Sequence, residues 1–177
     1  MASNEITMRR TTKTIAASLL LACTTLTVGA QESESNGTWG GLHIGYGTRI
    51  ESPGVGVMVQ TWLVNWARLE IGGDYFFDGK KKDLMDKDHN VTLCDINTNI
   101  HFVVPLQGKV NPYALLGGGV IFCSGKGISS ETNIGPNVGA GIDLRVSPKT
   151  RVNIEWHHQF VKDYGQSVFT LGAVFKF

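Results

Sequence analysis

The residues best suited to chemistry gather near position 155, where Glu155 is followed by His157 and His158. Carboxylate and imidazole groups serve as general acids, general bases and metal ligands. The surrounding segment, 151–160, alternates apolar and polar residues, which predicts a strand whose adjacent side chains point to opposite faces. His157 and His158 therefore cannot hold one metal ion together. We expect one of them in the interior and the other at the surface, with no catalysis, no cofactor and no metal.

Other charged residues occur singly on one face of several predicted strands, beside glycine and asparagine. They are mixed in sign, so they could pair in a narrow interior where glycine leaves room for a longer neighbour. A buried charge is tolerated only when it is paired and hydrogen-bonded. The sequence therefore predicts one interior charge network, made of Arg68, Glu70, Asp74, Asp143, Arg145, Arg151 and Glu155.

Cys94 and Cys123 are the only cysteines after residue 30. They lie at the same end of two predicted neighbouring strands, and a hairpin turning at Gly108 and Lys109 would place them directly opposite each other. An oxidising compartment would permit a bond between them. The pair is therefore a candidate disulfide, and the alternative is two free thiols in a slipped register.

Residues 1–30 have the pattern of a secretory signal peptide. Basic residues at positions 9, 10 and 13 precede an apolar run, and small residues precede the expected cleavage site after Ala30. Two alternatives stay open. Cys23 follows a sequence resembling a lipobox and could carry a lipid, and the apolar run could anchor the chain, although it is short for a membrane span.

The remainder, 31–177, is predicted to be one domain by its length. Its acidic and basic residues nearly balance, and the whole chain has a formal net charge of only +1. Such a balance gives no indication of nucleic-acid binding. No stretch after residue 30 is predicted to be a transmembrane helix, so a membrane protein of this sequence would have to be a closed barrel.

The elements that position these side chains are predicted to be β-strands. Apolar residues alternate with small or polar ones at every second position, which is the pattern of a strand. It recurs in eight segments, which are 37–49, 55–63, 67–78, 91–104, 110–123, 132–145, 151–160 and 166–177. In 110–123 both faces are apolar, so the pattern does not orient that strand. The connections are short enough for an up-and-down meander. The longest are the charged segment 78–90 and the Gly/Ser-containing segment 123–132.

The composition of the two faces favours a membrane barrel over a soluble one. The outer face of a soluble barrel would be rich in Lys, Glu and Ser, whereas the less apolar face here has sparse charges of mixed sign. Aromatic residues near the strand ends are typical of the girdles at membrane interfaces. We predict an all-β fold, an eight-stranded antiparallel up-and-down transmembrane β-barrel. A soluble periplasmic β-barrel is the alternative.

The last predicted strand, 166–177, has an apolar face with aromatic residues at both ends. We expect it to face lipid and to pair with the strand beginning near Gly37, which would close the barrel and remove both sheet edges. The residues of this face that we expect to matter for assembly are Phe169, Leu171, Phe175 and Phe177.

Two motifs resemble small outer-membrane barrels of the OmpA/OmpX/opacity-protein type, a porin-like family. They are the segment 111–120, Asn-Pro-Tyr-Ala-Leu-Leu-Gly-Gly-Gly-Val, and the segment 137–143, which is followed by Ser147-Pro148. The resemblance covers roughly 37–177 and implies a location in a Gram-negative outer membrane, in contact with outer-membrane lipid and lipopolysaccharide. It also implies that the strand ending in Phe177 is an assembly signal for the barrel-assembly machinery.

The function implied by this resemblance is structural or surface-interacting, with 78–90 and 123–132 as contact surfaces for a ligand. Lys80, Lys81 and Lys82 could touch lipopolysaccharide. One alternative is a narrow channel, which the small lumen of eight strands restricts. Another is a lipid A acyl hydrolase, because a barrel enzyme of this architecture carries a His-x-Ser pair. Here Gln159 follows His158, and Ser167 does not restore the spacing.

Overall fold

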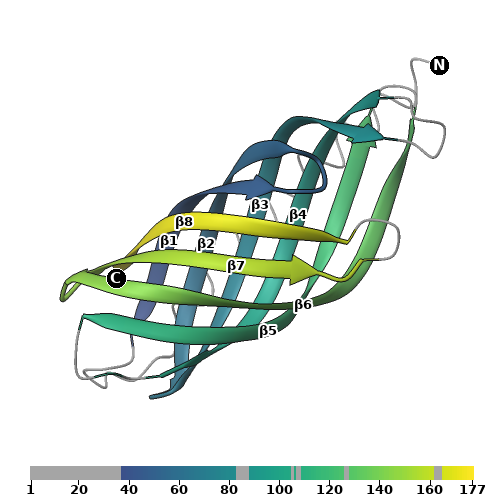
Figure 1. The fold of residues 1–177 in the computed structure, drawn as a ribbon. Coiled ribbons are helices and arrows are strands. Elements are labelled where there is room, and N and C mark those ends of the chain that lie inside the picture. The colour runs from purple at the N-terminus through teal and green to yellow at the C-terminus, as the bar shows by residue number, and fades with distance from the viewer. Residues whose placement is uncertain (1–36, 83–87, 105, 107–108, 126–127, 162–164) are drawn as a thin grey trace. The chain divides into compact units, whose positions relative to one another are not determined.

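The structure, a computed structural model, describes residues 37–82, 88–104, 106, 109–125, 128–161 and 165–177. The expected signal peptide and Cys23 lie outside these residues. The described chain forms eight strands that close into one barrel, each antiparallel to its sequence neighbours, with β1 pairing β8 (Figure 1). The strands are β1 (Thr38–Gly47), β2 (Ser52–Val64), β3 (Ala67–Lys82), β4 (Asp88–Val103), β5 (Val110–Gly125), β6 (Ile128–Ser147), β7 (Thr150–Gln159) and β8 (Gln166–Lys176). The predicted eight-stranded up-and-down barrel is confirmed.

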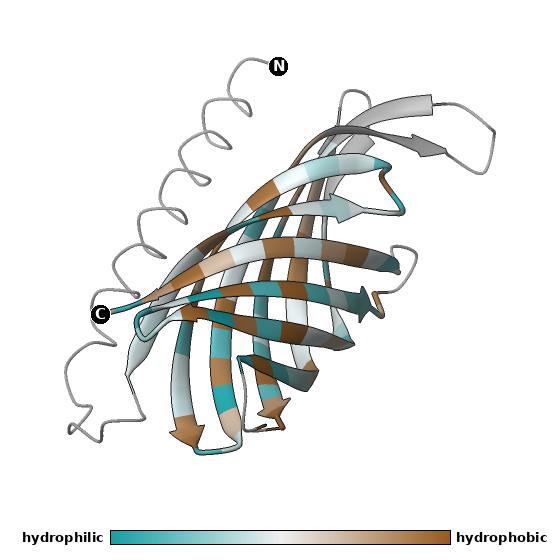
Figure 2. Ribbon diagram, turned by 60° about the vertical axis from the view of Figure 1, so that its left-hand side comes forward, coloured by the Kyte–Doolittle hydropathy of each residue, from teal (hydrophilic) through white to brown (hydrophobic). Residues whose placement is uncertain are grey.

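The predicted alternation sets the two faces of each strand. In β8, Val168 and Val174 are fully buried in the interior, while Phe169, Leu171 and Phe175 are exposed on the outside. Figure 2 shows the hydropathy alternating along the strands in the same way. The apolar face therefore lies outside, as predicted from the composition of the faces. No helix in the described part of the chain is long and apolar enough to cross a membrane.

The two long loops that the sequence predicted are mostly strand. The ladder between β3 and β4 continues through the pairs Gly79–Val91 and Lys82–Asp88, after a bulge beyond Phe76. Between β5 and β6 it reaches Gly125 and Ile128. Charged and small residues suggested loops at 78–90 and 123–132, but ladder hydrogen bonds join backbone groups and need no apolar face.

These extensions make the barrel uneven in height. Strand β6 has 20 residues whereas its neighbour β7 has 10. The pairing of β6 with β7 stops at Asn137, so the first part of β6 pairs with β5 alone. Strands β3 to β6 thus extend past the others at one end (Figure 1). We call two pairs of strand segments the tall hairpins: 77–82 with 88–92, and 123–125 with 128–133. The end of the barrel to which they extend is the hairpin end.

Apolar layers close the interior above and below its polar middle. The layer toward the hairpin end consists of Ile50, Phe76, Leu93, Ile121, Cys123, Val161 and Val168. The layer toward the opposite end consists of Trp39, Met58, Val174, Val103, Tyr113 and Leu115, with Trp62 packed against it. The interior is therefore not polar throughout, and strand β5, which the pattern could not orient, supplies apolar side chains to both layers.

Candidate functional site

Between the apolar layers lies a group of buried polar side chains, which we call the polar layer. Its members come from the inner faces of β3, β4, β6 and β7, with His43 from β1, Gln60 from β2, and Gln166 and Thr170 from β8. Six of the seven predicted network charges are buried there: Arg68, Glu70, Asp74, Asp143, Arg151 and Glu155. Sequence reasoning missed one further acid, Asp95, and the partners His43, Gln60, Asn97, Asn99, His101, Asn137, Asn153 and Gln159. His157 is buried there too, as expected for one of the two adjacent histidines.

Arg145, the seventh predicted member, is exposed near the end of β6. Its ladder partner is Arg151, and the register shifts just beyond this pair. The prediction was wrong for this residue because period-two alternation gives the face of a residue but not its height in the barrel. No buried ion pair among the described residues includes Arg145.

Asp143 is the centre of the cationic part of the polar layer. Its carboxylate accepts hydrogen bonds from Arg68 and, at 2.9 Å, from Nη1 of Arg151. The Arg151 guanidinium also donates to Oε1 of Gln60 at 2.9 Å and lies 4.2 Å from the ring centre of Trp39. Both buried arginines are therefore paired, as low-dielectric surroundings require.

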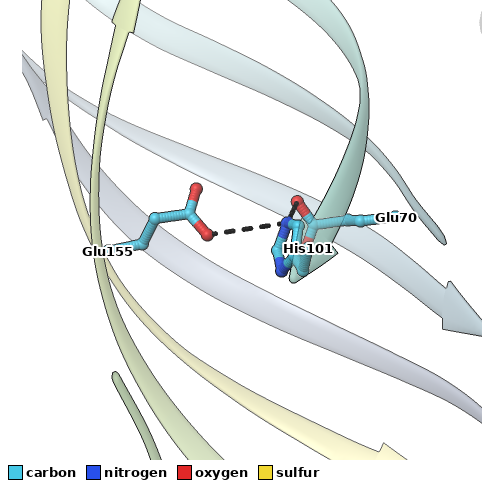
Figure 3. A group of neighbouring side chains, drawn as sticks. All are labelled: Glu70, His101 and Glu155. Atoms are coloured by element: carbon cyan, nitrogen blue, oxygen red, sulfur yellow. Dashed lines mark ion pairs between the residues drawn. The ribbon is translucent and has the colours of Figure 1, made fainter. Parts of the chain in front are cut away.

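His101 lies between two carboxylates in the same layer (Figure 3). Its Nε2 is 3.4 Å from Oε1 of Glu70 and 3.9 Å from Oε2 of Glu155. These three groups are close enough together to be considered as metal ligands. However, Nε of Arg68 donates a hydrogen bond to Nδ1 of His101 at 3.2 Å. The neutral ring then carries its proton on Nε2, which leaves no lone pair for a metal at that atom.

Both glutamates of this trio have further hydrogen-bond donors. Gln60 donates to Oε2 of Glu70 at 2.7 Å, and the Tyr113 hydroxyl donates to Oε2 of Glu155 at 2.8 Å. The ring of Tyr113 stacks on His101 with centroids 4.7 Å apart. The trio thus joins β3, β4 and β7, with both glutamates hydrogen-bonded, while Nε2 of His101 makes no hydrogen bond to a described residue.

Two other histidines line a small cavity in the polar layer. The cavity has a volume of about 20 Å³, and His43, Asp74, Asn153, Glu155 and His157 are among its walls. That volume is close to what one water molecule needs. His43 Nε2 binds the carboxylate of Asp74, and Nδ1 of His157 lies 3.1 Å from Oε1 of Glu155.

The glycines of β5 make room for the asparagines of β4. A Cβ on Gly119 would lie 2.2 Å from Oδ1 of Asn97, and one on Gly117 would lie 2.1 Å from the backbone oxygen of Thr98. The nearby Asn137 donates to Asn97 Oδ1 at 2.8 Å. A side chain at either glycine would therefore displace a neighbouring group on β4.

His158 faces outward, as expected for one of the two adjacent histidines. Its ladder partner on β8 is Ser167, and His158 Nδ1 lies 3.0 Å from the Ser167 hydroxyl oxygen. Sequence spacing alone had argued against a partnership of these residues, because the strand ladder rather than the local sequence brings them together. Both side chains are half-buried.

The predicted disulfide between Cys94 and Cys123 is not formed. The ladder pairs Leu93 with Cys123 and Cys94 with Phe122, one residue away from the expected register. A shift of one residue moves a side chain to the opposite face. Cys94 therefore faces outward and Cys123 inward, which separates the two sulfur atoms by the thickness of the sheet.

The outer surface carries a broad set of exposed apolar side chains. The residues predicted for assembly belong to it, with Phe169, Leu171 and Phe175 each about half exposed and Phe177 82% exposed. Large exposed apolar areas of this kind mark contact with a membrane or with another protein.

A family model described as "Outer membrane protein beta-barrel domain" matches residues 16–177. No curated protein matches the chain in sequence. The solved structure of Neisserial surface protein A is similar with a TM-score of 0.64 and 15% identity, covering 81% of this chain and 97% of that one.

Two further solved barrels are similar in fold. Ail, the attachment invasion locus protein of Yersinia pestis, solved in complex with the heparin analogue sucrose octasulfate, matches with a TM-score of 0.57 and 14% identity, over 80% of this chain and 97% of Ail. The N-terminal β-barrel domain of Pseudomonas aeruginosa OprF matches with the same score and identity, over 80% of this chain and 99% of that domain. At such identities the similarity concerns the fold alone.

Proposed function

We propose that this chain, which belongs to the outer membrane protein β-barrel domain family, is a non-conducting and non-catalytic barrel with a structural and surface-contact role. The family and the structural neighbours place the barrel in the outer membrane. The observation that carries the proposal is the closed interior, where two apolar layers enclose a hydrogen-bonded polar layer.

The closed interior supports a barrel without a channel. The side chains of Phe76, Leu93, Ile121 and Val168 are almost completely buried in the layer toward the hairpin end. An eight-stranded barrel is narrow enough for its side chains to fill the lumen. Purified barrel in planar bilayers should therefore give no stable ohmic channel, and a large stable conductance would contradict the proposal.

The tall hairpins are the proposed contact surface. They extend beyond the ends of β1, β2, β7 and β8, so a partner approaching the hairpin end would contact them first. The sequence of one of them includes Lys80, Lys81 and Lys82, which suits an anionic partner such as the phosphates of lipopolysaccharide. Exposed charges bind such a partner in a salt-dependent way.

Binding of the barrel, held in nanodiscs, to lipopolysaccharide micelles tests this contact. Replacing Lys80, Lys81 and Lys82 with glutamine should weaken the binding, and added salt should weaken the wild-type binding. Lys149→Gln is the matched control, because this exposed lysine lies at the opposite end of the barrel, beside Lys176 of β8. Equal binding by the triple variant and the wild type would remove the hairpin lysines from the proposal.

The last strand is the proposed assembly signal for the barrel-assembly machinery. Its support is the outward aromatic row ending in Phe177 and the position of β8 as the strand that closes on β1. A strand that is recognised before closure keeps its edge available for pairing until the barrel completes.

A second candidate function, hydrolysis of an acyl ester in a lipid such as lipid A, is favoured by the contact between Ser167 and His158. In acyl-transfer enzymes, a serine hydroxyl that is hydrogen-bonded to an imidazole serves as the nucleophile, and the imidazole serves as its general base. Release of fatty acid from lipid A by the purified barrel, lost in Ser167→Ala, would establish this function. Absence of release would leave the non-catalytic proposal standing.

A further inference from the structure

His43 and His157 both line one small cavity, and each is held by a carboxylate. His43 binds the carboxylate of Asp74 through Nε2, and His157 binds that of Glu155 through Nδ1. A carboxylate accepts, so in each neutral ring the nitrogen facing the carboxylate carries the proton. The other nitrogen then holds a lone pair. Carboxylate-backed imidazoles of this kind are the usual arrangement of histidine metal ligands.

The second nitrogens of these histidines have no partner. His43 Nδ1 and His157 Nε2 are buried atoms without a hydrogen bond to any described residue, and so is Oδ1 of Asn153. The three side chains are 9%, 4% and 1% exposed, respectively, and all three line the cavity of about 20 Å³. A body the size of one water molecule or one ion fits this volume.

All of these unpartnered atoms have lone pairs, so the same kind of bound species can satisfy each of them. The two imidazole lone pairs and the amide oxygen each offer electrons, and Glu70 and Asp74 add carboxylates to the cavity wall. An occupant that satisfies them must be positively charged or must donate hydrogen bonds.

The charge of the interior points to a cation. Its buried carboxylates are Glu70, Asp74, Asp95, Asp143 and Glu155, and its buried guanidiniums are Arg68 and Arg151. Asp74 and Asp95 are direct ladder partners, and two buried carboxylates so close together share one proton. With neutral histidines, the described interior then has four negative and two positive groups, which leaves two uncompensated negative charges. Both guanidiniums bind Asp143, so neither is hydrogen-bonded to the carboxylates that line the cavity. Uncompensated charge in such a place is costly.

We propose that this cavity is a binding site for one divalent transition-metal ion such as Zn²⁺. The nitrogen ligands of the ion are His43 and His157. Imidazole nitrogen favours this class of ion over Mg²⁺ and Ca²⁺, which prefer oxygen. Asn153 supplies an oxygen beside them, and Asp74 and Glu155 orient the two rings. His101 is not a ligand, because its Nδ1 accepts from Arg68.

The test measures the metal content of the whole barrel. Because apolar layers enclose the cavity, the protein is refolded into detergent micelles with Zn²⁺ present, and a second sample receives Zn²⁺ after folding. Both are passed through a column containing a weak chelator before elemental analysis. We expect about one Zn²⁺ per chain in at least the first sample. Co²⁺ in its place should give the visible absorption bands of a nitrogen-containing site.

Substitutions separate this site from adventitious binding. His43→Gln and His157→Gln should each lower Zn²⁺ affinity at least about 100-fold, and Asp74→Asn about 10- to 100-fold through the orientation of His43. His158→Gln is the matched control, since this outward histidine is adjacent to His157 and should leave the affinity unchanged. Heat-modifiable gel migration shows which variants have folded.

Two results would overturn the site. One is a folded wild-type barrel that retains no Zn²⁺ under either protocol, which would assign the cavity to a water molecule or to protons on the histidines. The other is equal Zn²⁺ retention by the wild type and by the folded double variant His43→Gln/His157→Gln. The wild-type measurement decides the matter even where a variant fails to fold.

Discussion

Arg68 on β3 binds the carboxylate of Asp143 on β6, although these strands are not ladder neighbours. The contact therefore crosses the interior and ties together strands that the backbone ladder connects only through others. Arg151 on β7 binds the same carboxylate, so three strands meet at one side chain. These ion pairs hold β3, β6 and β7 together across the interior, which gives the buried charges a structural role.

Asp143→Ala should be strongly destabilising. It leaves two buried guanidiniums without their carboxylate, and removing one partner of a buried ion pair costs about 3–5 kcal/mol. The measurement is the urea midpoint of refolding into lipid vesicles. Arg145→Ala is the control, since this exposed arginine should change stability by less than about 0.5 kcal/mol. Equal midpoints for both variants would contradict the importance of the cross-barrel tie.

Leu171→Arg should destabilise the barrel in lipid by about 2–4 kcal/mol, because this outward residue lies midway along β8 and an arginine there would face hydrocarbon. Val146→Arg, close to the end of β6, should cost only about 0–1 kcal/mol. Both side chains are exposed and apolar. The comparison uses unfolding in vesicles, and a flat profile along the strand would argue against a lipid-facing outer surface.

The wild-type chain should migrate identically on gels with and without reductant, since Cys94 and Cys123 lie on opposite faces of the sheet. The double variant Leu93→Cys/Cys94→Ala should instead crosslink to Cys123 under oxidation, because residue 93 is its direct ladder partner. A disulfide in the wild type, or none in the double variant, would show that the register is different.

Deletion of Phe177 should impair assembly more than it changes the folded barrel. The backbone N–H of Phe177 donates to the carbonyl of Thr38 at 3.1 Å, and its ring lies over Gly40, so the residue helps close β8 on β1. The readout is the fraction of newly made protein that becomes heat-modifiable. Phe160→Ala, at another exposed outward aromatic, is the control. Unchanged assembly without Phe177 would remove the assembly-signal interpretation.

The sequence predicts the barrel well because one physical rule, alternation of side chains along a strand, repeats in every element. It places Arg68, Glu70 and Asp74 on the inner face and Leu171 on the outer one without further information. The tall hairpins were missed because polar residues at 78–90 are compatible with either a loop or a paired strand.

The candidate site could be predicted only in part, because alternation contains no information on height or on partners across the barrel. Arg145 shares a face with Asp143 but lies too close to the strand end to be buried. The cavity brings together His43 and His157 from β1 and β7, which are not ladder neighbours. The one-residue error at Cys94 shows how sensitive such contacts are to register.

The most direct test of the account is the location and gel migration of the native protein in fractionated cells. An outer-membrane barrel with an apolar outside should be found in the outer-membrane fraction and should migrate at a different position when unboiled, because the closed barrel resists detergent until it is heated. Recovery as a soluble periplasmic protein, with the same migration before and after boiling, would contradict the account.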